Sequence, residues 1–191
     1  MKILLDTCVL YPTVMREVLL GVARQGMFTP LWSQRILDEW SRAAVKLGPQ
    51  GQVQAEGEIA MVSAQWPNAS VTWKPSLHDR LWLPDPNDIH ILAAAIAGHA
   101  DVILTMNVKD FPRNILAEEG LSRADPDGFL VGLFASAPEP VTAAVSAVHA
   151  KANTLSGQDW DLRKLMKKAR LPRLGKALAS GQDFSDEKSP G

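Results

Sequence analysis

The stretch from Leu83 to Phe111 constrains the fold more than any other part of the chain. Asp85 followed by Pro86 is typical of a helix start, because Pro is tolerated in the first turn and Asp accepts hydrogen bonds from free N–H groups. An apolar stripe of helical period follows and ends at Gly98. The short apolar run 102–105 then predicts a strand of a parallel sheet, buried on both faces.

Polar residues lie where that predicted strand ends. Open parallel sheets bind ligands at the carboxyl ends of their strands, so Thr105, Met106 and Asn107 point to a candidate site. Asp88 lies in the first turn of the preceding helix and is near enough to share it.

The N-terminus supplies a second anchor for the same site. The run Ile3–Leu5 predicts a strand, and Asp6 ends it. Packing seldom places an acid there, because unpaired carboxylates are almost never buried. Further along, Ser33 is expected to cap a helix that carries Glu39 at the edge of its apolar stripe.

Asp6, Glu39 and Asp88 therefore occupy positions that suit a binuclear metal site, with Asp85 and Asp110 flanking them. Mg²⁺ and Mn²⁺ prefer oxygen ligands, and they relieve the repulsion between clustered carboxylates. Such a site can generate hydroxide and neutralise an in-line phosphoryl transition state. Each acid also has a structural explanation, since helix capping alone can place Asp85 and Asp88, and a single Glu on a helix edge is usually solvated.

Bulk composition limits the class of protein. The chain has 191 residues, is 46% hydrophobic and carries a net charge of −1, so it lacks the global basic field of many nucleic-acid binders. Its single cysteine fits a reducing compartment. The start of the chain has too short an apolar run for a signal peptide, and no run is long enough for a membrane helix. We therefore expect a cytoplasmic protein with no membrane partner.

Alternating strands and helices predict an α/β fold with a mainly parallel sheet over residues 1–137. A composition shift near Pro138 predicts a domain boundary, and residues 138–191 are expected to form a helical, basic extension whose last ten residues are disordered. The expected strands are 3–5, 28–31, 69–73, 102–105 and 121–123, and the segment 74–83 is expected to be a loop. Lysines and arginines between 164 and 176 form the best local phosphate-binding patch, or else a helix face that docks on the first domain or on an acidic partner.

Three pieces together resemble a known family, although none of them is specific alone. They are LLDTCVL at 4–10, ILDEW at 36–40 and DPNDIHILAAAIAGHADVILTMNVKDF at 85–111. In order and spacing they resemble the PIN-domain metal-dependent ribonucleases, in particular VapC-type toxins. The resemblance implies a three-layer α/β/α fold and hydrolysis of RNA that leaves a 5′-phosphate and a 3′-hydroxyl. It also implies an antitoxin whose peptide fills the acidic groove, and a homodimer.

The resemblance also assigns residues. It implies that Asp6, Glu39 and Asp88 hold Mg²⁺ or Mn²⁺ and that Thr105 supports them with its hydroxyl. Many relatives carry Asp where this chain has Asn107, which can coordinate or orient a water but supplies no charge.

Asp110, three residues after Asn107, either compensates for the missing charge or caps the helix after Phe111. The missing charge puts a strongly held second metal ion in doubt. It also leaves room for a catalytically silent PIN fold that only binds.

Other side chains are weaker candidates. Trp82, beside the acidic loop, is a possible platform for a base, and Arg16, Lys109 and Arg113 are possible phosphate contacts, although a solvated charge is the commoner role for each. The four histidines lack ligand spacing, so we expect structural or surface roles for them.

A rival function makes Asp6 itself a nucleophile, as in haloacid-dehalogenase-like phosphatases and phosphotransferases. Those enzymes usually carry a second Asp two positions later, where this chain has Cys8. A lone cysteine at such a turn is most often a small buried hydrophobe.

Overall fold

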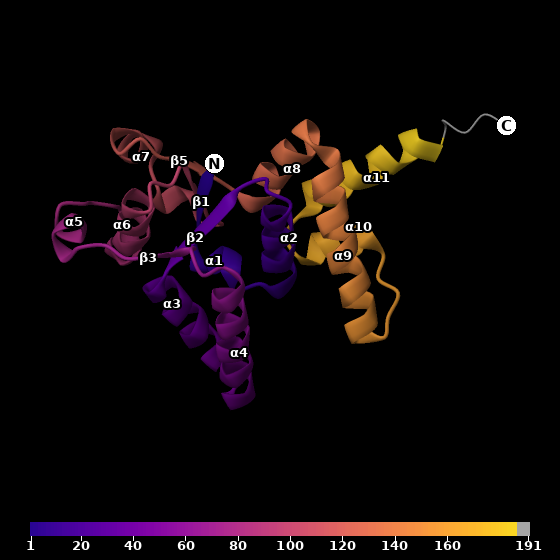
Figure 1. Ribbon diagram of the computed structural model, residues 1–191, viewed down its shortest axis with the longest axis horizontal. Coiled ribbons are helices and arrows are strands. Elements are labelled where there is room, and N and C mark those ends of the chain that lie inside the picture. The colour runs from indigo at the N-terminus through magenta and orange to yellow at the C-terminus, as the bar shows by residue number, and fades with distance from the viewer. Residues whose placement is uncertain (187–191) are drawn as a thin grey trace. The chain divides into compact units, whose positions relative to one another are not determined.

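A computed structural model describes residues 1–186, and within them five parallel strands form one sheet in the order β3-β2-β1-β4-β5 (Figure 1). In its centre, Ile3 of β1 lies opposite Pro30 of β2 and Val102 of β4. The predicted parallel α/β sheet is confirmed. The strands are β1 Lys2–Leu5, β2 Thr29–Ser33, β3 Ser70–Val71, β4 Val102–Leu104 and β5 Ser122–Ala124.

Helices cover both faces of this sheet, as the predicted three-layer fold requires. From β1 the chain steps outward to β2 and β3, then returns to β4 on the other side of β1. Right-handed crossovers in opposite directions place their helices on opposite faces. Figure 1 accordingly shows α3 and α4 on one side of the sheet and α6 and α7 on the other. The connecting helices are α1 Thr7–Leu10, α3 Gln34–Ala44, α4 Pro49–Gln65, α5 Pro75–Asp79, α6 Ile89–Ala97 and α7 Arg113–Glu118.

Local sequence signals explain where these helices begin. Ser33 caps α3 by accepting a hydrogen bond from the Ile36 amide, as predicted. Asp85 caps the short 3₁₀ helix Pro86–Asp88, which leads directly into α6. The expected loop at 74–83 is wrong in part, because α5 begins at Pro75, whose fixed φ suits a first helical turn.

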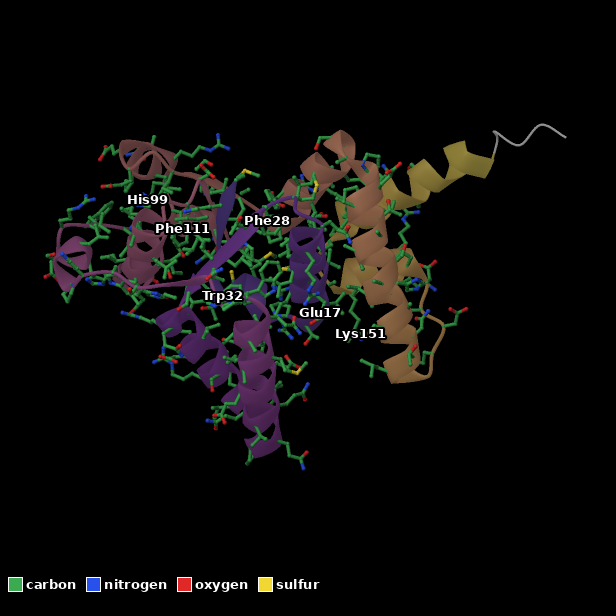
Figure 2. The ribbon with its side chains drawn as sticks, in the orientation of Figure 1. Glu17, Phe28, Trp32, His99, Phe111 and Lys151 are labelled. Carbon is green, nitrogen blue, oxygen red and sulfur yellow. The ribbon has the colours of Figure 1, made fainter. Side chains whose placement is uncertain are left out.

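The core of this first unit is continuous from the sheet to α6. Trp32 and Phe111 are fully buried, and Figure 2 labels both. Every residue from Ile89 to Ala95 is also buried, so α6 is enclosed on all sides. A helix enclosed in this way fixes the position of the acidic segment that precedes it.

The described chain divides into two compact units, made of residues 1–11 with 28–125 and of residues 12–27 with the described residues from 126 onward. The second unit is helical, and the boundary predicted near Pro138 falls between its helices α8 and α9. Its helices are α2 Thr13–Arg24, α8 Pro126–Ser136, α9 Pro138–Ser156, α10 Leu162–Lys168 and α11 Pro172–Asp186.

Helix α2 packs closely on α9 within this second unit. A Cβ on Gly21 of α2 would lie 3.1 Å from the Ala144 side chain, so glycine permits the close approach. Lys151 Nζ of α9 lies 2.9 Å from Glu17 Oε2 of α2, and Figure 2 shows this pair. A helix from the N-terminal part of the sequence thus belongs with the C-terminal helices.

The end of the chain differs from expectation in part. Helix α11 runs to Asp186, into the last ten residues that we expected to be disordered, and the rest of that prediction lies outside the described residues. Over residues 1–186, no helix combines the length and the apolar character that crossing a membrane demands.

Candidate metal centre

The site lies where the strand order reverses direction. β1 and β4 are neighbours, but the chain leaves β1 toward one edge of the sheet and β4 toward the other. Such a switch point opens a crevice at the carboxyl ends of the two strands. Asp6 directly follows β1, and Thr105 directly follows β4.

These two residues are joined by hydrogen bonds. The Asp6 amide donates to the Leu104 carbonyl at 3.1 Å, which continues the ladder between β1 and β4. The Thr105 hydroxyl donates to Asp6 Oδ2 at 2.6 Å, and both side chains are buried. One carboxylate oxygen of Asp6 is therefore fixed by the neighbouring strand.

Cys8 also contacts the Asp6 carboxylate. Its Sγ lies 3.1 Å from Asp6 Oδ2 and accepts a hydrogen bond from the Met106 amide at 3.2 Å. Burial and the negative charge of Asp6 raise the pKa of the Cys8 thiol to about 12. Cys8 is thus a protonated, half-buried thiol at neutral pH, close to the small hydrophobe that the sequence predicted.

Three further acids gather near Asp6. One carboxylate oxygen each from Asp85, Asp88 and Asp110 lies within 4.8 Å of the other two. Burial, followed by the charges of Asp6, Asp85 and Asp110, raises the pKa of Asp88 to about 6. We call Asp6, Asp85, Asp88 and Asp110 the acidic edge.

The acidic edge fits a hard divalent cation by its chemistry. Its donors are all carboxylate oxygens, which Mg²⁺ and Mn²⁺ prefer. The raised pKa of Asp88 shows that its negative charge is only partly compensated by the protein. A cation would supply the missing compensation.

Asn107 positions one member of this edge. Its side-chain amide donates a hydrogen bond to Asp110 Oδ2, while its backbone amide donates to the Thr105 hydroxyl at 2.9 Å. Helix α7 begins at Arg113 with Pro112 as its N-cap, so Asp110 does not cap it. Asp110 was predicted either to compensate for the charge that Asn107 lacks or to cap a helix. The structure supports the first role, because Asp110 lies with the other acids.

Glu39 lies outside the three-acid group and has its own partners. Thr7 Oγ1 donates to Glu39 Oε2 at 2.9 Å, and His90 Nε2 lies 2.9 Å from Glu39 Oε1. Burial acts to raise the pKa of Glu39, but the hydrogen bond and charge of His90, with help from Thr7 and Arg35, hold it below its usual value. Glu39 is therefore an anion held by Thr7, the residue that follows Asp6 in the chain.

Sequence reasoning missed the contact between His90 and Glu39. His90 is 1% exposed, and among the described residues its Nδ1 has no hydrogen-bond partner. The ring packs against Trp73 at a centroid distance of 6.4 Å. The available signal was a polar residue inside a helix that is otherwise apolar on every face.

The predicted RNA contacts have different environments. Trp82 is 65% exposed, and Lys109 and Arg113 are exposed on the first unit. Arg16 is 1% exposed and lies on α2 of the second unit. Its burial argues against the predicted phosphate contact, so this part of the prediction is corrected.

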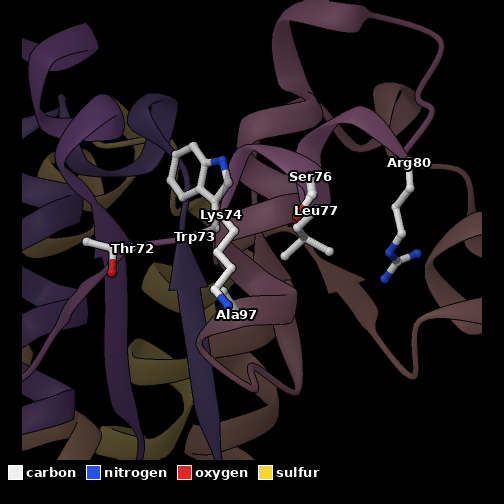
Figure 3. Close-up of a pocket in the computed structure, with 7 residues that line it drawn as sticks. All are labelled: Thr72, Trp73, Lys74, Ser76, Leu77, Arg80 and Ala97. Carbon is white, nitrogen blue, oxygen red and sulfur yellow. The ribbon is translucent and has the colours of Figure 1, made fainter.

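A separate hollow of about 420 Å³ lies between the segment after β3 and helix α5, with Ala97 of α6 on its wall (Figure 3). Trp73 and Lys74 line it but no acid of the acidic edge does. Arg80, also on its wall, forms a two-bonded ion pair with Glu119, at 2.6 and 2.8 Å. Trp73 links the hollow to the surroundings of the site, because its ring packs on His90.

Fold and site together define an α/β protein with a carboxylate centre at a topological switch point. The sequence model of the PIN domain family matches residues 2–109, which is more than half of the chain. The chain therefore belongs to the PIN domain family. PIN domains are generally nucleases that use a divalent metal, and this one carries an acidic cluster.

A solved structure of VapBC-1 from nontypeable Haemophilus influenzae is also similar to this chain. The identity is 19%, the match covers 66% of this chain and 98% of the other, and the TM-score is 0.45. No curated protein sequence matches significantly.

Proposed function

We propose that this protein is a metal-dependent endoribonuclease that hydrolyses RNA phosphodiester bonds. The observation that carries the proposal is the convergence of the acidic edge at the switch point of a PIN domain. Four carboxylates from three separate parts of the chain repel one another when they are close, and a cation would relieve that repulsion.

Within this proposal, Asp6 and Asp88 hold Mg²⁺ or Mn²⁺, and Asp85 and Asp110 complete the set of oxygen donors. When bound, the ion supplies positive charge for the scissile phosphate and lowers the pKa of water. Thr105 keeps Asp6 oriented through the 2.6 Å hydrogen bond.

Glu39 has a different role in the proposal. It is anionic and is fixed by His90 and Thr7, so it can accept a proton from the attacking water or hold a second ion. His90 acts as a positioning residue, because its Nε2 lies 2.9 Å from Glu39 Oε1. Asn107 likewise positions Asp110. Trp82, Lys109 and Arg113 remain proposed RNA contacts on the exposed surface of the first unit.

By resemblance to VapC-type toxins in segments 4–10, 36–40 and 85–111, we further propose that an antitoxin restrains the protein in the cytoplasm. Its peptide would occupy the acidic groove, and the toxin would be a homodimer. Cleavage would leave a 5′-phosphate and a 3′-hydroxyl, as in that family.

The test compares the purified full chain with Asp6→Asn on a fluorescent single-stranded RNA in Mn²⁺. We expect cleavage by the wild type that chelator abolishes and Asp6→Asn lacks. Asp38→Asn, an exposed acid beside Glu39 on α3, is the matched control and should cleave normally. Equal cleavage by wild type and Asp6→Asn would reject the proposal in favour of a silent PIN fold, and a trapped phospho-aspartate would favour the phosphatase.

A further inference from the structure

The second unit carries a concentrated positive surface that the proposed metal centre does not use. Between Arg163 and Lys176 the sequence contains seven lysines and arginines and no acid. This segment comprises α10 and the start of α11, which pack against one another. We call residues 163–176 the basic hairpin.

Packing turns the charged side chains of the basic hairpin outward. Leu165, Met166 and Leu174 are buried, and a Cβ on Gly175 would lie 2.9 Å from the Met166 side chain. Glycine thus lets α11 approach α10 closely. The apolar positions face inward, and the lysines and arginines of both helices are exposed; they are Arg163, Lys164, Lys167, Lys168, Arg170, Arg173 and Lys176.

The two acids next to the hairpin, Asp161 and Asp127, accept hydrogen bonds from backbone N–H groups at helix starts. Asp161 caps α10 by accepting a hydrogen bond from the Lys164 amide at 2.8 Å. Asp127 accepts hydrogen bonds from the Arg173 and Leu174 amides at the start of α11, and from Arg173 Nε at 3.3 Å. Asp161 thus serves a backbone N–H group, whereas Asp127 also pairs with the side chain of Arg173. The other six lysines and arginines of the hairpin lie outside this ion pair.

An aromatic ring adjoins this positive surface. Lys168 Nζ lies 4.7 Å from the centroid of the Trp160 ring, and Trp160 Nε1 donates to the Ser156 hydroxyl at 3.1 Å. The indole is therefore held in place and only half buried. Cations beside an aromatic face are the combination that binds single-stranded nucleic acid, through phosphates and a stacked base.

We propose that the basic hairpin binds the phosphate backbone of single-stranded RNA, as a contact surface separate from the metal centre. The inference rests on the proposed function for its choice of RNA. Six exposed cations besides Arg173, which pairs with Asp127, favour a polyanion, and the adjacent indole favours an unpaired strand over a duplex.

The experiment measures binding without cleavage. The full chain carrying Asp6→Asn, in chelator, is titrated with a fluorescent single-stranded RNA from 50 to 300 mM salt. Adding Lys164→Gln and Lys167→Gln should weaken binding about tenfold at 100 mM salt and reduce the salt slope by about 1. Both residues are exposed, and circular dichroism checks the fold.

The matched control adds Lys46→Gln and Lys74→Gln, two exposed lysines of the first unit, and should bind like the parent. Equal affinity and slope for the hairpin and control variants would overturn the inference. So would hairpin-dependent binding of poly-glutamate without RNA, which would indicate an acidic protein partner. Because no metal is present, these outcomes are independent of whether the enzyme cleaves.

Discussion

The acidic edge of the first unit and the basic hairpin of the second carry charge of opposite sign, and they differ in how far that charge is buried. At the acidic edge, carboxylate oxygens of Asp85, Asp88 and Asp110 lie within 4.8 Å of one another, and the charges of Asp6, Asp85 and Asp110 raise the cost of ionising Asp88. In the hairpin, the charges are exposed and spread over two helices. Buried charges interact strongly, whereas exposed charges are screened by water and salt.

This contrast predicts different responses to mutation. Residues that act as a unit give large, non-additive losses, whereas distant exposed residues give small losses that add. The following substitutions test whether each region behaves in this way.

The largest effect is expected for Asp6→Asn. It removes a carboxylate while keeping an oxygen that can accept the Thr105 hydrogen bond. We expect cleavage to fall by about 10³-fold, the equivalent of several kcal/mol of transition-state stabilisation. Combining it with Asp88→Asn should add little. Initial cleavage rates measure this. If the double mutant cleaved much more slowly than Asp6→Asn alone, the two carboxylates would not act as one unit.

His90→Ala should weaken by about 10- to 100-fold the binding of the second Mn²⁺ ion that we propose for Glu39, because Glu39 loses the hydrogen bond that orients it. His90→Gln keeps a side-chain donor and should restore part of the affinity. The measurement is titration calorimetry with Mn²⁺ alone, and His78→Ala, on the surface helix α5, is the control. Unchanged Mn²⁺ affinity in His90→Ala would show that His90 only fills space.

Asp88→Asn should stabilise the metal-free protein. The pKa of Asp88 is raised from 3.8 to about 6, so the folded state binds more protons than the unfolded state between those values. Stability from this group is therefore present at low pH and lost as pH rises toward 6. At pH 7.5 in chelator we expect Asp88→Asn to gain about 1 kcal/mol after solvent screening.

The same comparison has an internal control. Well below pH 3.8, position 88 is neutral in the folded and unfolded states of both proteins, and the difference should vanish. With Mn²⁺ added, wild type should become the more stable of the two, since only it binds the ion tightly. Thermal unfolding in the two buffers measures this, and the same order in both would argue against a cation at the acidic edge.

The smallest effect is expected for single substitutions in the basic hairpin. Lys164→Gln and Lys167→Gln should each weaken RNA binding about threefold, with effects that add, because exposed phosphate contacts act nearly independently. Fluorescence anisotropy with the cleavage-deficient protein measures this. Strong coupling between the two would mean that the hairpin is a folded recognition pocket and not an open surface.

The sequence predicted those features that follow from local rules. Asp6 and Thr105 end buried strands, and parallel strands share one carboxyl edge, so their meeting could be anticipated. The Ser33 cap and the Asp85 cap follow from turn chemistry in the same way.

Other features depended on packing between distant segments. Nothing local to His90 indicates that Glu39 lies across from it, since the two sit on helices far apart in the chain. Similarly, the apolar stripe of α2 predicts a buried face but does not say whether the sheet or the C-terminal helices will cover it. Arg16 was misjudged for the same reason, because its burial depends on that packing partner.

The most direct test of the central claim is a crystal soaked in Mn²⁺ and measured at a wavelength that gives anomalous scattering from manganese. The account predicts an anomalous peak at the acidic edge, about 2.0–2.3 Å from oxygens of Asp6 and Asp88, which is the usual range for such ions. Absence of a peak there, or a peak bound only by acids outside this edge, would contradict it.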